Sequence, residues 1–256
     1  MRKQVAGTLI SQMMKTIGLA VFVLTAASFA QVAIPPGTIL PVELNSSLRS
    51  GKVRPGQTIS ARVMQDVPLA TGSRIRSGTK VIGHVVAVKS ATQARKAEIT
   101  LRFDTVEEGN RRLPVTTNLR ALASMMDVDE AQIPEMGSDR GSSEADWVTE
   151  QIGGDVAYHG AAVTQGSDIV GHALLGGGVM VNASAQPGAA CRGVVDGDRG
   201  PQALWLFSSD ACGAYGYPNV TLAHAGRDNP IGEITLQAER GNLNIRAGSG
   251  MLLRVD

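Results

Sequence analysis

The chain has 256 residues, of which 43% are hydrophobic, 18% charged and only 4% aromatic. This hydrophobic content is enough to form a buried core, so it excludes a disordered chain, a collagen-like repeat and a protein with many membrane spans. With 24 basic and 23 acidic side chains, the formal net charge is +1. This total by itself points to no charged partner.

The first thirty residues have the pattern of an export signal. Basic residues precede an uncharged apolar run at 17–27, and Ser28-Phe29-Ala30 offers small residues where a signal peptidase cuts. The run is shorter than the about 20 residues of a membrane-spanning helix. We therefore expect residues 1–30 to be a signal peptide cleaved before Gln31. The mature chain would be secreted or periplasmic, without a transmembrane span.

Cys191 and Cys212 are the only cysteines. An even number in an oxidising compartment favours a disulfide, which would stabilise the fold by about 3 kcal/mol in the chain-entropy model. A competing interpretation is a thiolate nucleophile, because Cys191-Arg192 with His159-Gly160 upstream resembles the Cys-Arg and His-Gly elements of L,D-transpeptidases, which cross-link cell walls. No Ser-x-Gly precedes Cys191 and no aliphatic residue separates it from Arg192. We favour the disulfide.

Charge is divided unevenly along the chain. Residues 31–123 hold 14 basic and 6 acidic side chains, a net charge of +8, whereas residues 124–256 hold 7 basic and 17 acidic ones, a net charge of −10. Nine of those acids lie between Asp127 and Asp155. We therefore expect a basic domain at 31–123, an acidic connector at 124–154 and a second domain at 155–256.

Both expected domains have the patterns of β-strands. Glu98 to Asp104 and Gln57 to Val63 alternate apolar and polar residues, whereas Lys80 to Lys89 is an almost continuous apolar run, typical of a strand buried on both faces or in a barrel. Strand candidates in the second domain are 203–207, 220–223, 233–236, 243–245 and 251–255. The predicted fold class is all-β, made of small barrel or sandwich modules.

The segments between these strands are interpreted as turns and loops. Gly-Asn pairs at 109–110 and 241–242 predict hairpin turns. The acidic connector is interpreted as a loop, in which Ser143-Glu144-Ala145-Asp146 has the sequence of a cap for a short helix.

Short matches between the two halves indicate an internal repeat. Ser77 to His84 aligns with Gln165 to His172, and Glu98-Ile99-Thr100-Leu101 recurs identically at 233–236. If the repeat is real, the fold contains two pseudo-repeats, and the second carries an insertion that contains the disulfide. The alternative is that turns and strands in both halves use the same small and β-branched residues.

Residues 33–90 contain closely spaced Pro-Gly and Gly-Thr turns between short apolar runs. Ile34-Pro35-Pro36-Gly37-Thr38 opens this stretch, and Gly78-Thr79-Lys80-Val81-Ile82-Gly83 lies near its end. This order of motifs resembles the barrel domain of the outer-membrane core-complex proteins of type IV secretion and conjugation machines. The resemblance implies a barrel fold in the cell envelope and, as one functional alternative, a component of a secretion apparatus.

The sequence lacks the common catalytic and cofactor-binding motifs. It has no Gly-x-Ser-x-Gly elbow, no His-Glu-x-x-His, no P-loop and no dinucleotide-binding glycine pattern. The four histidines lack the spacing of metal ligands, and His84 and His172 follow glycines on apolar strands, where we expect hydrogen-bonded sheet residues. We expect no cofactor, no metal and no catalysis. A glycosidase-type carboxylate pair is left open, because its spacing is spatial rather than sequential.

Two groups of residues are candidates for binding. Basic side chains gather on two turns, and we predict anion binding by Arg49, Lys52, Arg54, Arg74, Arg76 and Lys80. Aromatic side chains gather around Cys212, and either a carbohydrate- or protein-binding surface or the small core of a disulfide-linked lobe is predicted for Trp205, Phe207, Tyr215 and Tyr217. Because Phe103 is the only aromatic residue between Gln31 and Asp146, we expect no stacking platform for nucleic acid.

These features together favour an exported, non-catalytic envelope protein that acts in binding or assembly. The expected partners are anionic polysaccharide, envelope proteins, or a second copy of the chain whose acidic connector docks on the basic domain. The alternatives are a cell-wall processing enzyme, of the L,D-transpeptidase or glycosidase type, and a secretion-apparatus component.

Overall fold

The computed structural model places most of the expected basic domain and the end of the chain. It describes residues 33–69, 71–132, 151–153, 202–204, 206–208, 211–223 and 231–256, and the backbone of strands at 157–159, 162–165, 168–173 and 179–181. The predicted signal peptide, most of the acidic connector, Cys191 and Trp205 lie outside these residues. The export signal and the disulfide therefore stay predictions. No helix in the described part is both long and apolar enough to span a membrane.

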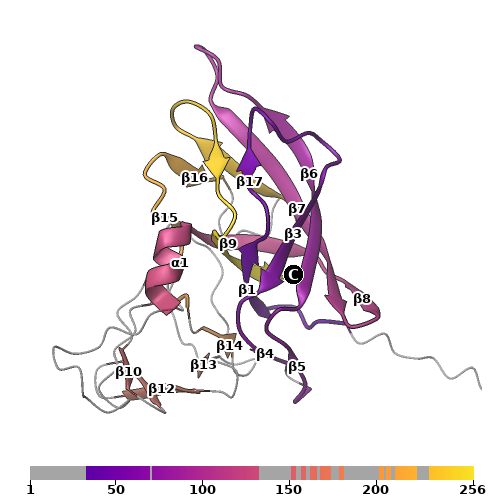
Figure 1. Cartoon of the computed structure of the whole chain (residues 1–256). Helices are drawn as coiled ribbons and strands as arrows, with labels where there is room; N and C mark the ends of the chain where they lie inside the picture. The colour runs from indigo at the N-terminus through magenta and orange to yellow at the C-terminus, as the bar shows by residue number, and fades with distance from the viewer. Residues whose placement is uncertain are drawn as a thin grey trace, which may run out of the picture. The chain divides into compact units, whose positions relative to one another are not determined.

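One large mixed sheet dominates the described residues and confirms the all-β fold class. Its ten strands are β1 (Ile39–Leu44), β3 (Thr58–Val63), β6 (Lys80–Lys89), β7 (Ala97–Glu108), β8 (Arg111–Pro114), β9 (Thr117–Ala123), β15 (Gly213–Tyr215), β16 (Val220–Leu222), β17 (Ile234–Ala238) and β19 (Gly250–Val255). Their hydrogen-bonded order is β15-β9-β19-β1-β3-β6-β7-β17-β16, and β8 pairs with β7 (Figure 1).

The other described strands form smaller sheets. Five antiparallel strands pair in chain order: β10 (Ala157–His159), β11 (Ala162–Gln165), β12 (Asp168–Ala173), β13 (Val179–Val181) and β14 (Gln202–Ala203). Two-stranded pairs join β2 (Leu48–Arg49) to β18 (Asn244–Ile245) and β4 (Val67–Pro68) to β5 (Arg74–Ile75). The described part has one helix, α1 (Met125–Gln132).

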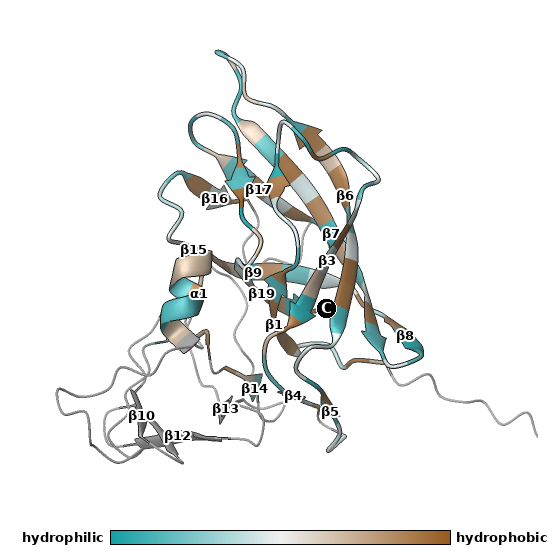
Figure 2. Cartoon of the chain, viewed as in Figure 1, coloured by the Kyte–Doolittle hydropathy of each residue, from teal (hydrophilic) through white to brown (hydrophobic). Residues whose placement is uncertain are grey.

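The alternating sequences place their apolar residues in the main core, as predicted. In β7, Ile99, Leu101 and Phe103 are completely buried, and β3 buries its own apolar side chains in the same way. In contrast, the apolar run of β6 is not buried on both faces, because its burial alternates and Ile82 is only half-buried. Hydrophobic and hydrophilic residues alternate along β7 as brown and teal bands (Figure 2).

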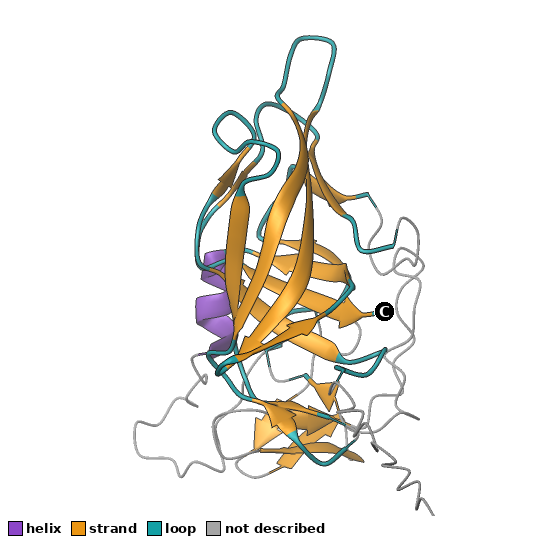
Figure 3. Cartoon of the chain, turned by 90° about the vertical axis from the view of Figure 1, so that its right-hand side faces the viewer, coloured by secondary structure: helices purple, strands orange, loops and turns teal. Residues whose placement is uncertain are grey.

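The large sheet curves strongly but does not close into a barrel (Figure 3). Its edge strands, β15 and β16, are consecutive in the chain, yet no strand pairing joins them in the residues that are described. Each has only three residues, and β15 runs parallel to β9, so the continuous staggered ladder that closes a barrel cannot form. Of the barrel or sandwich modules expected from the sequence, the closed barrel is not formed, and the large sheet is open and curved.

The beginning and the end of the chain share this sheet. β17 pairs with β7, and β19 lies between β1 and β9. Residues 32–256 accordingly form one compact unit. The expected boundary between segments 31–123 and 155–256 does not separate two sheets.

The segments matched as an internal repeat do not form two alike modules. β6 and β7 are hydrogen-bonded neighbours, whereas β12 and β17, the matching strands, lie in different sheets. The identical tetrapeptides are instead antiparallel partners of each other, with Thr100 opposite Thr235 and their hydroxyl oxygens 3.1 Å apart. The predicted hairpin at 241–242 is also wrong, because the strands on either side of it, β17 and β18, belong to different sheets.

A second apolar cluster covers the outer face of β1, β9 and β19. Helix α1 contributes Val128 and Ala131, and the segment around β14 contributes Phe207. Because β9 is covered on both faces, each of its seven residues is buried. The helix itself was not predicted, although the Ser124 hydroxyl accepts a hydrogen bond from the Asp127 amide at 3.2 Å in a capping pattern present in the sequence.

Candidate functional site: a basic rim at one end of the sheet

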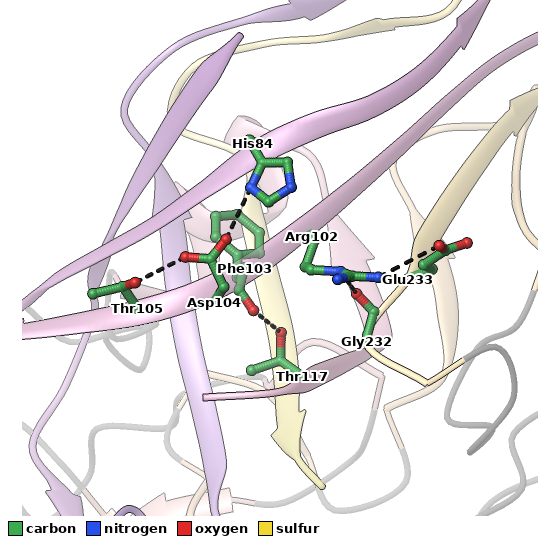
Figure 4. A network of polar contacts seen from close by, with 8 residues as sticks. All are labelled: His84, Arg102, Phe103, Asp104, Thr105, Thr117, Gly232 and Glu233. Atoms are coloured by element: carbon green, nitrogen blue, oxygen red, sulfur yellow. Dashed lines mark hydrogen bonds and ion pairs between the residues drawn. The ribbon is translucent and has the colours of Figure 1, made fainter. Parts of the chain in front are cut away.

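Charged residues on the outer face of the large sheet pair across neighbouring strands. His84 Nδ1 lies 2.8 Å from Asp104 Oδ2, which confirms His84 as a hydrogen-bonded sheet residue (Figure 4). One strand further along, Arg102 Nη2 lies 3.5 Å from Glu233 Oε1. The Arg102 Nε also donates to the carbonyl oxygen of Gly232 at 3.2 Å. These groups satisfy one another and leave little net charge on the face.

Every acidic side chain of residues 33–123 has a basic partner at 3.4 Å or less. The pairs are Arg62–Glu43, Arg74–Asp66, Lys80–Glu107, Arg112–Glu107, His84–Asp104, Lys89–Glu98 and Arg111–Glu108. Such exposed pairs stabilise a fold by only about 0–1 kcal/mol each. These ion pairs matter more for binding than for stability. Because they neutralise the acids of this segment, its excess positive charge must lie on basic residues outside the pairs.

Three loops that meet at one end of the sheet carry most of those bases. They are residues 49–57, which begin at the last residue of β2, the hairpin loop 90–96 between β6 and β7, and the turn 239–243 after β17. The hairpin loop projects beyond the strands at the top of Figure 3 and is hydrophilic at its tip (Figure 2). The three loops therefore present a shared surface built from distant parts of the sequence.

Ser50 and Asn242 join these loops through hydrogen bonds. The buried Ser50 hydroxyl donates to Asn242 Oδ1 at 3.3 Å and accepts from the Leu243 amide at 3.1 Å. The Ala91 amide donates to the same Asn242 oxygen at 3.3 Å, and Ser90 Oγ donates to the Ser50 carbonyl at 3.1 Å. The relative positions of the loops are therefore fixed by the folded protein.

Six exposed cationic side chains on these loops form what we call the basic rim: Arg49, Lys52, Arg54, Arg95, Lys96 and Arg240. None of the six has an ion pair among the described residues. The three loops contain a single acid, Glu239. Like charges held together repel one another and concentrate anions nearby, so the rim is a candidate site for a negatively charged ligand.

An open cleft of 340 Å³ lies between the hairpin loop and the turn after β17. Its walls are formed by Ala91, Thr92, Gln93, Ala94, Arg95, Lys96, Glu239, Arg240 and Gly241. Three of the six rim cations therefore border one cavity, where arginine forks can pair with a carboxylate or phosphate group.

The six anion-binding residues predicted from the sequence do not form one site. Arg49, Lys52 and Arg54 belong to the rim. In contrast, Lys80 begins β6 while the rim loops meet at the end of that ten-residue strand, about 33 Å away. Arg74, Arg76 and Lys80 form a separate group there, in which Arg74 and Lys80 pair with acids. The structure therefore separates the two predicted groups, and anion binding by either of them stays a prediction.

Sequence reasoning missed Arg95, Lys96 and Arg240. Their loops are separated by more than 140 residues, and only the pairing of β17 with β7 brings them together. The available signal was local: Arg95 and Lys96 are adjacent in the short segment between the strands predicted at 80–89 and 98–104.

Of the aromatic residues predicted near Cys212, Phe207 is buried, Tyr215 and Tyr217 are half-buried, and Trp205 lies outside the described residues. Phe207 is completely buried in the second apolar cluster, so it is not a surface residue. Tyr215 packs against the same cluster, and its hydroxyl oxygen accepts a hydrogen bond from the Cys212 amide at 2.9 Å. The Tyr217 hydroxyl lies 2.5 Å from Ser249 Oγ. Phe207 and Tyr215 thus pack in a cluster shared with β1, β9 and β19, and the small core of a disulfide-linked lobe stays a prediction.

Comparisons with known proteins add no identification: no protein-family model, curated protein or solved structure matches the chain. Within the described residues, no group of three or more His, Cys, Asp and Glu side chains could hold a metal ion.

Proposed function

We propose that this chain is an exported, non-catalytic envelope protein that binds anionic polysaccharide through the basic rim. The observation that carries the proposal is the distribution of charge. Acids and bases of the sheet pair with each other, whereas six exposed cations share three joined loops with one acid. A fold keeps such self-repelling charges at a small stability cost, and an anionic ligand relieves the repulsion.

The surroundings of the rim favour a polysaccharide over a nucleic acid. Proteins that bind single-stranded nucleic acid stack bases on exposed aromatic rings. Phe103, the one aromatic residue of segment 31–123, is completely buried, and none of the residues that line the cleft is aromatic. Recognition by charge and hydrogen bonds suits carboxylated or phosphorylated sugars, which an exported protein would meet.

The Ser50 and Asn242 hydrogen bonds support binding by reducing its entropic cost. Because the loops are held together before a ligand arrives, only the long side chains of the rim lose freedom on binding. Their positive charges act over about 10 Å at 0.1 M salt and over much less at higher ionic strength. We therefore expect binding to weaken steeply as salt is added.

Chromatography on immobilised polygalacturonate tests the proposal. We expect the mature chain to be retained at low ionic strength and released at about 1 M salt, where charges are screened within about 3 Å. Dextran, an uncharged polysaccharide, is the control and should not retain the protein. Passage through the polygalacturonate column without retention at low salt would rule the proposal out.

The acidic connector offers a second anionic ligand for the same rim. Nine acids lie between Asp127 and Asp155, against one base. If the connector of one copy occupies the rim of another, light scattering should give a mass above that of a monomer at low salt and a monomer mass at about 1 M, where such charges are screened. A monomer mass at every salt concentration would rule out this contact between copies.

A further inference from the structure

The cleft beside the rim contains more than positive charge. Its polar lining combines three cations with a carboxylate, a hydroxyl and an amide: Arg95, Lys96, Arg240, Glu239, Thr92 and Gln93. A site for a fully charged chain such as polyphosphate gains nothing from Glu239, which repels every unit of that ligand. The presence of Glu239 among the cations points to a ligand that carries both an anionic group and hydrogen-bond donors.

A sugar acid has these two features. Its carboxylate accepts the paired hydrogen bonds of an arginine fork, and its ring hydroxyls can donate to a carboxylate oxygen. The cleft volume of 340 Å³ lies at the low end of the range of about 300–1,000 Å³ for small-molecule pockets, which suits a short segment of sugar. No aromatic residue lines the cleft, so an uncharged sugar would find no ring to stack on.

Backbone hydrogen bonds hold both walls of the cleft in place. Thr92 and Arg95 form a bridge in which the Thr92 amide donates to the Arg95 carbonyl at 2.9 Å. On the opposite wall, the Glu239 amide donates to the Asn219 carbonyl at 2.7 Å. Because the backbone of Arg95 and Glu239 is held in this way, a ligand bound between them has to order only their exposed side chains.

We infer that this cleft is a subsite for one hexuronic acid unit. Arg95 and Arg240 hold the sugar carboxylate, and Glu239 accepts hydrogen bonds from the ring hydroxyls. The inference rests on the proposed function and gives it a sugar class. It assigns the rest of the basic rim, Arg49, Lys52 and Arg54, to contacts with neighbouring units of the polysaccharide.

Titration of the ¹⁵N-labelled mature chain with glucuronate, followed by NMR, tests the inference, with glucose and inorganic phosphate as comparison probes. We expect saturable shifts of the amides of 91–96 and 239–241 with glucuronate, and dissociation constants at least about tenfold higher for glucose and phosphate. Arg240→Gln should raise the dissociation constant for glucuronate at least about tenfold. Arg76→Gln removes the same charge elsewhere and should leave it unchanged.

Glu239→Gln separates recognition of a sugar from attraction of an anion. The variant should bind glucuronate more weakly and phosphate more tightly, because it loses a hydroxyl acceptor and a repulsive charge. If phosphate binds as tightly as glucuronate to the unmodified chain, or if residues 49–54 shift as much as the cleft, the inference is wrong. Retention on polygalacturonate without glucuronate binding refutes the subsite alone, whereas absence of both refutes the proposed function as well.

Discussion

Gly83 determines how the two longest strands of the sheet meet. The register between β6 and β7 shifts at this residue, and a Cβ atom there would lie 2.0 Å from the carbonyl oxygen of Arg102. The requirement for glycine is one of space, since the neighbouring backbone is too close for any side chain. This close approach sets the part of the outer face where His84 pairs with Asp104.

Replacement of Gly83 should therefore destabilise the fold. We expect Gly83→Ala to lower the free energy of unfolding by about 1–3 kcal/mol, because the two strands must move apart to admit the methyl group. Gly51→Ala is the matched control, since nothing lies within 4 Å of a Cβ at that position. Urea denaturation measures both variants. Equal stability of the two would show that the strands do not approach as described.

The pairing of Cys191 with Cys212 is a second prediction about single residues. Because the chain contains two cysteines and the fold is expected to form in an oxidising compartment, neither should react with a thiol reagent after denaturation without reductant. Mass spectrometry after alkylation measures this directly. Two alkylated cysteines in the unreduced, denatured protein would exclude the disulfide and reopen the thiolate interpretation.

The strands β9 and β19 are buried on both faces because two covering elements, helix α1 and the segment around Phe207, pack on the outer side. The difference between strands buried on one face and strands buried on both faces explains which elements could be predicted from the sequence. β3 and β7 alternate in polarity and are evident, because one face of each meets the core and the other meets solvent. β9 has no such alternation, and it buries polar residues such as Asn118, so its sequence lacks the strand pattern.

Removal of the Phe207 ring tests the covering layer. A Cβ atom added to Gly250 would lie 3.1 Å from Phe207 Cζ, so the ring packs directly on the backbone of β19. We expect Phe207→Ala to lower the free energy of unfolding by about 3–5 kcal/mol. Met126→Ala on helix α1, where the side chain is 68% exposed, should have little effect. A small effect of Phe207→Ala in thermal denaturation would contradict the packing.

Across the whole molecule, the two ends of the chain complete a single sheet. The positions of the charged residues in the sequence show that its two halves differ in net charge. Only the strand order shows that β17 and β19 pair with strands of the basic half. The same order creates the basic rim. Arg240 joins Arg95 and Lys96 because β17 lies beside β7, which no local pattern in the sequence reveals.

A fragment of residues 33–132 should consequently fail to fold by itself. It lacks β19, so β1 and β9 lose the strand that hydrogen-bonds to both. We expect no cooperative thermal transition by circular dichroism for this fragment, and a gain of strand signal when a peptide of residues 231–256 is added. A cooperative transition of the fragment alone would support the separate basic domain instead.

Binding of a polysaccharide should depend on where the positive charges lie rather than on how many there are. Two triple variants that lose three positive charges each test it on immobilised polygalacturonate: Arg95→Gln/Lys96→Gln/Arg240→Gln in the basic rim, and Arg76→Gln/Arg111→Gln/Arg112→Gln outside it. We predict that the rim variant binds at least about tenfold more weakly while the control elutes at the salt concentration of the unmodified chain. Equal weakening of both variants would contradict the account.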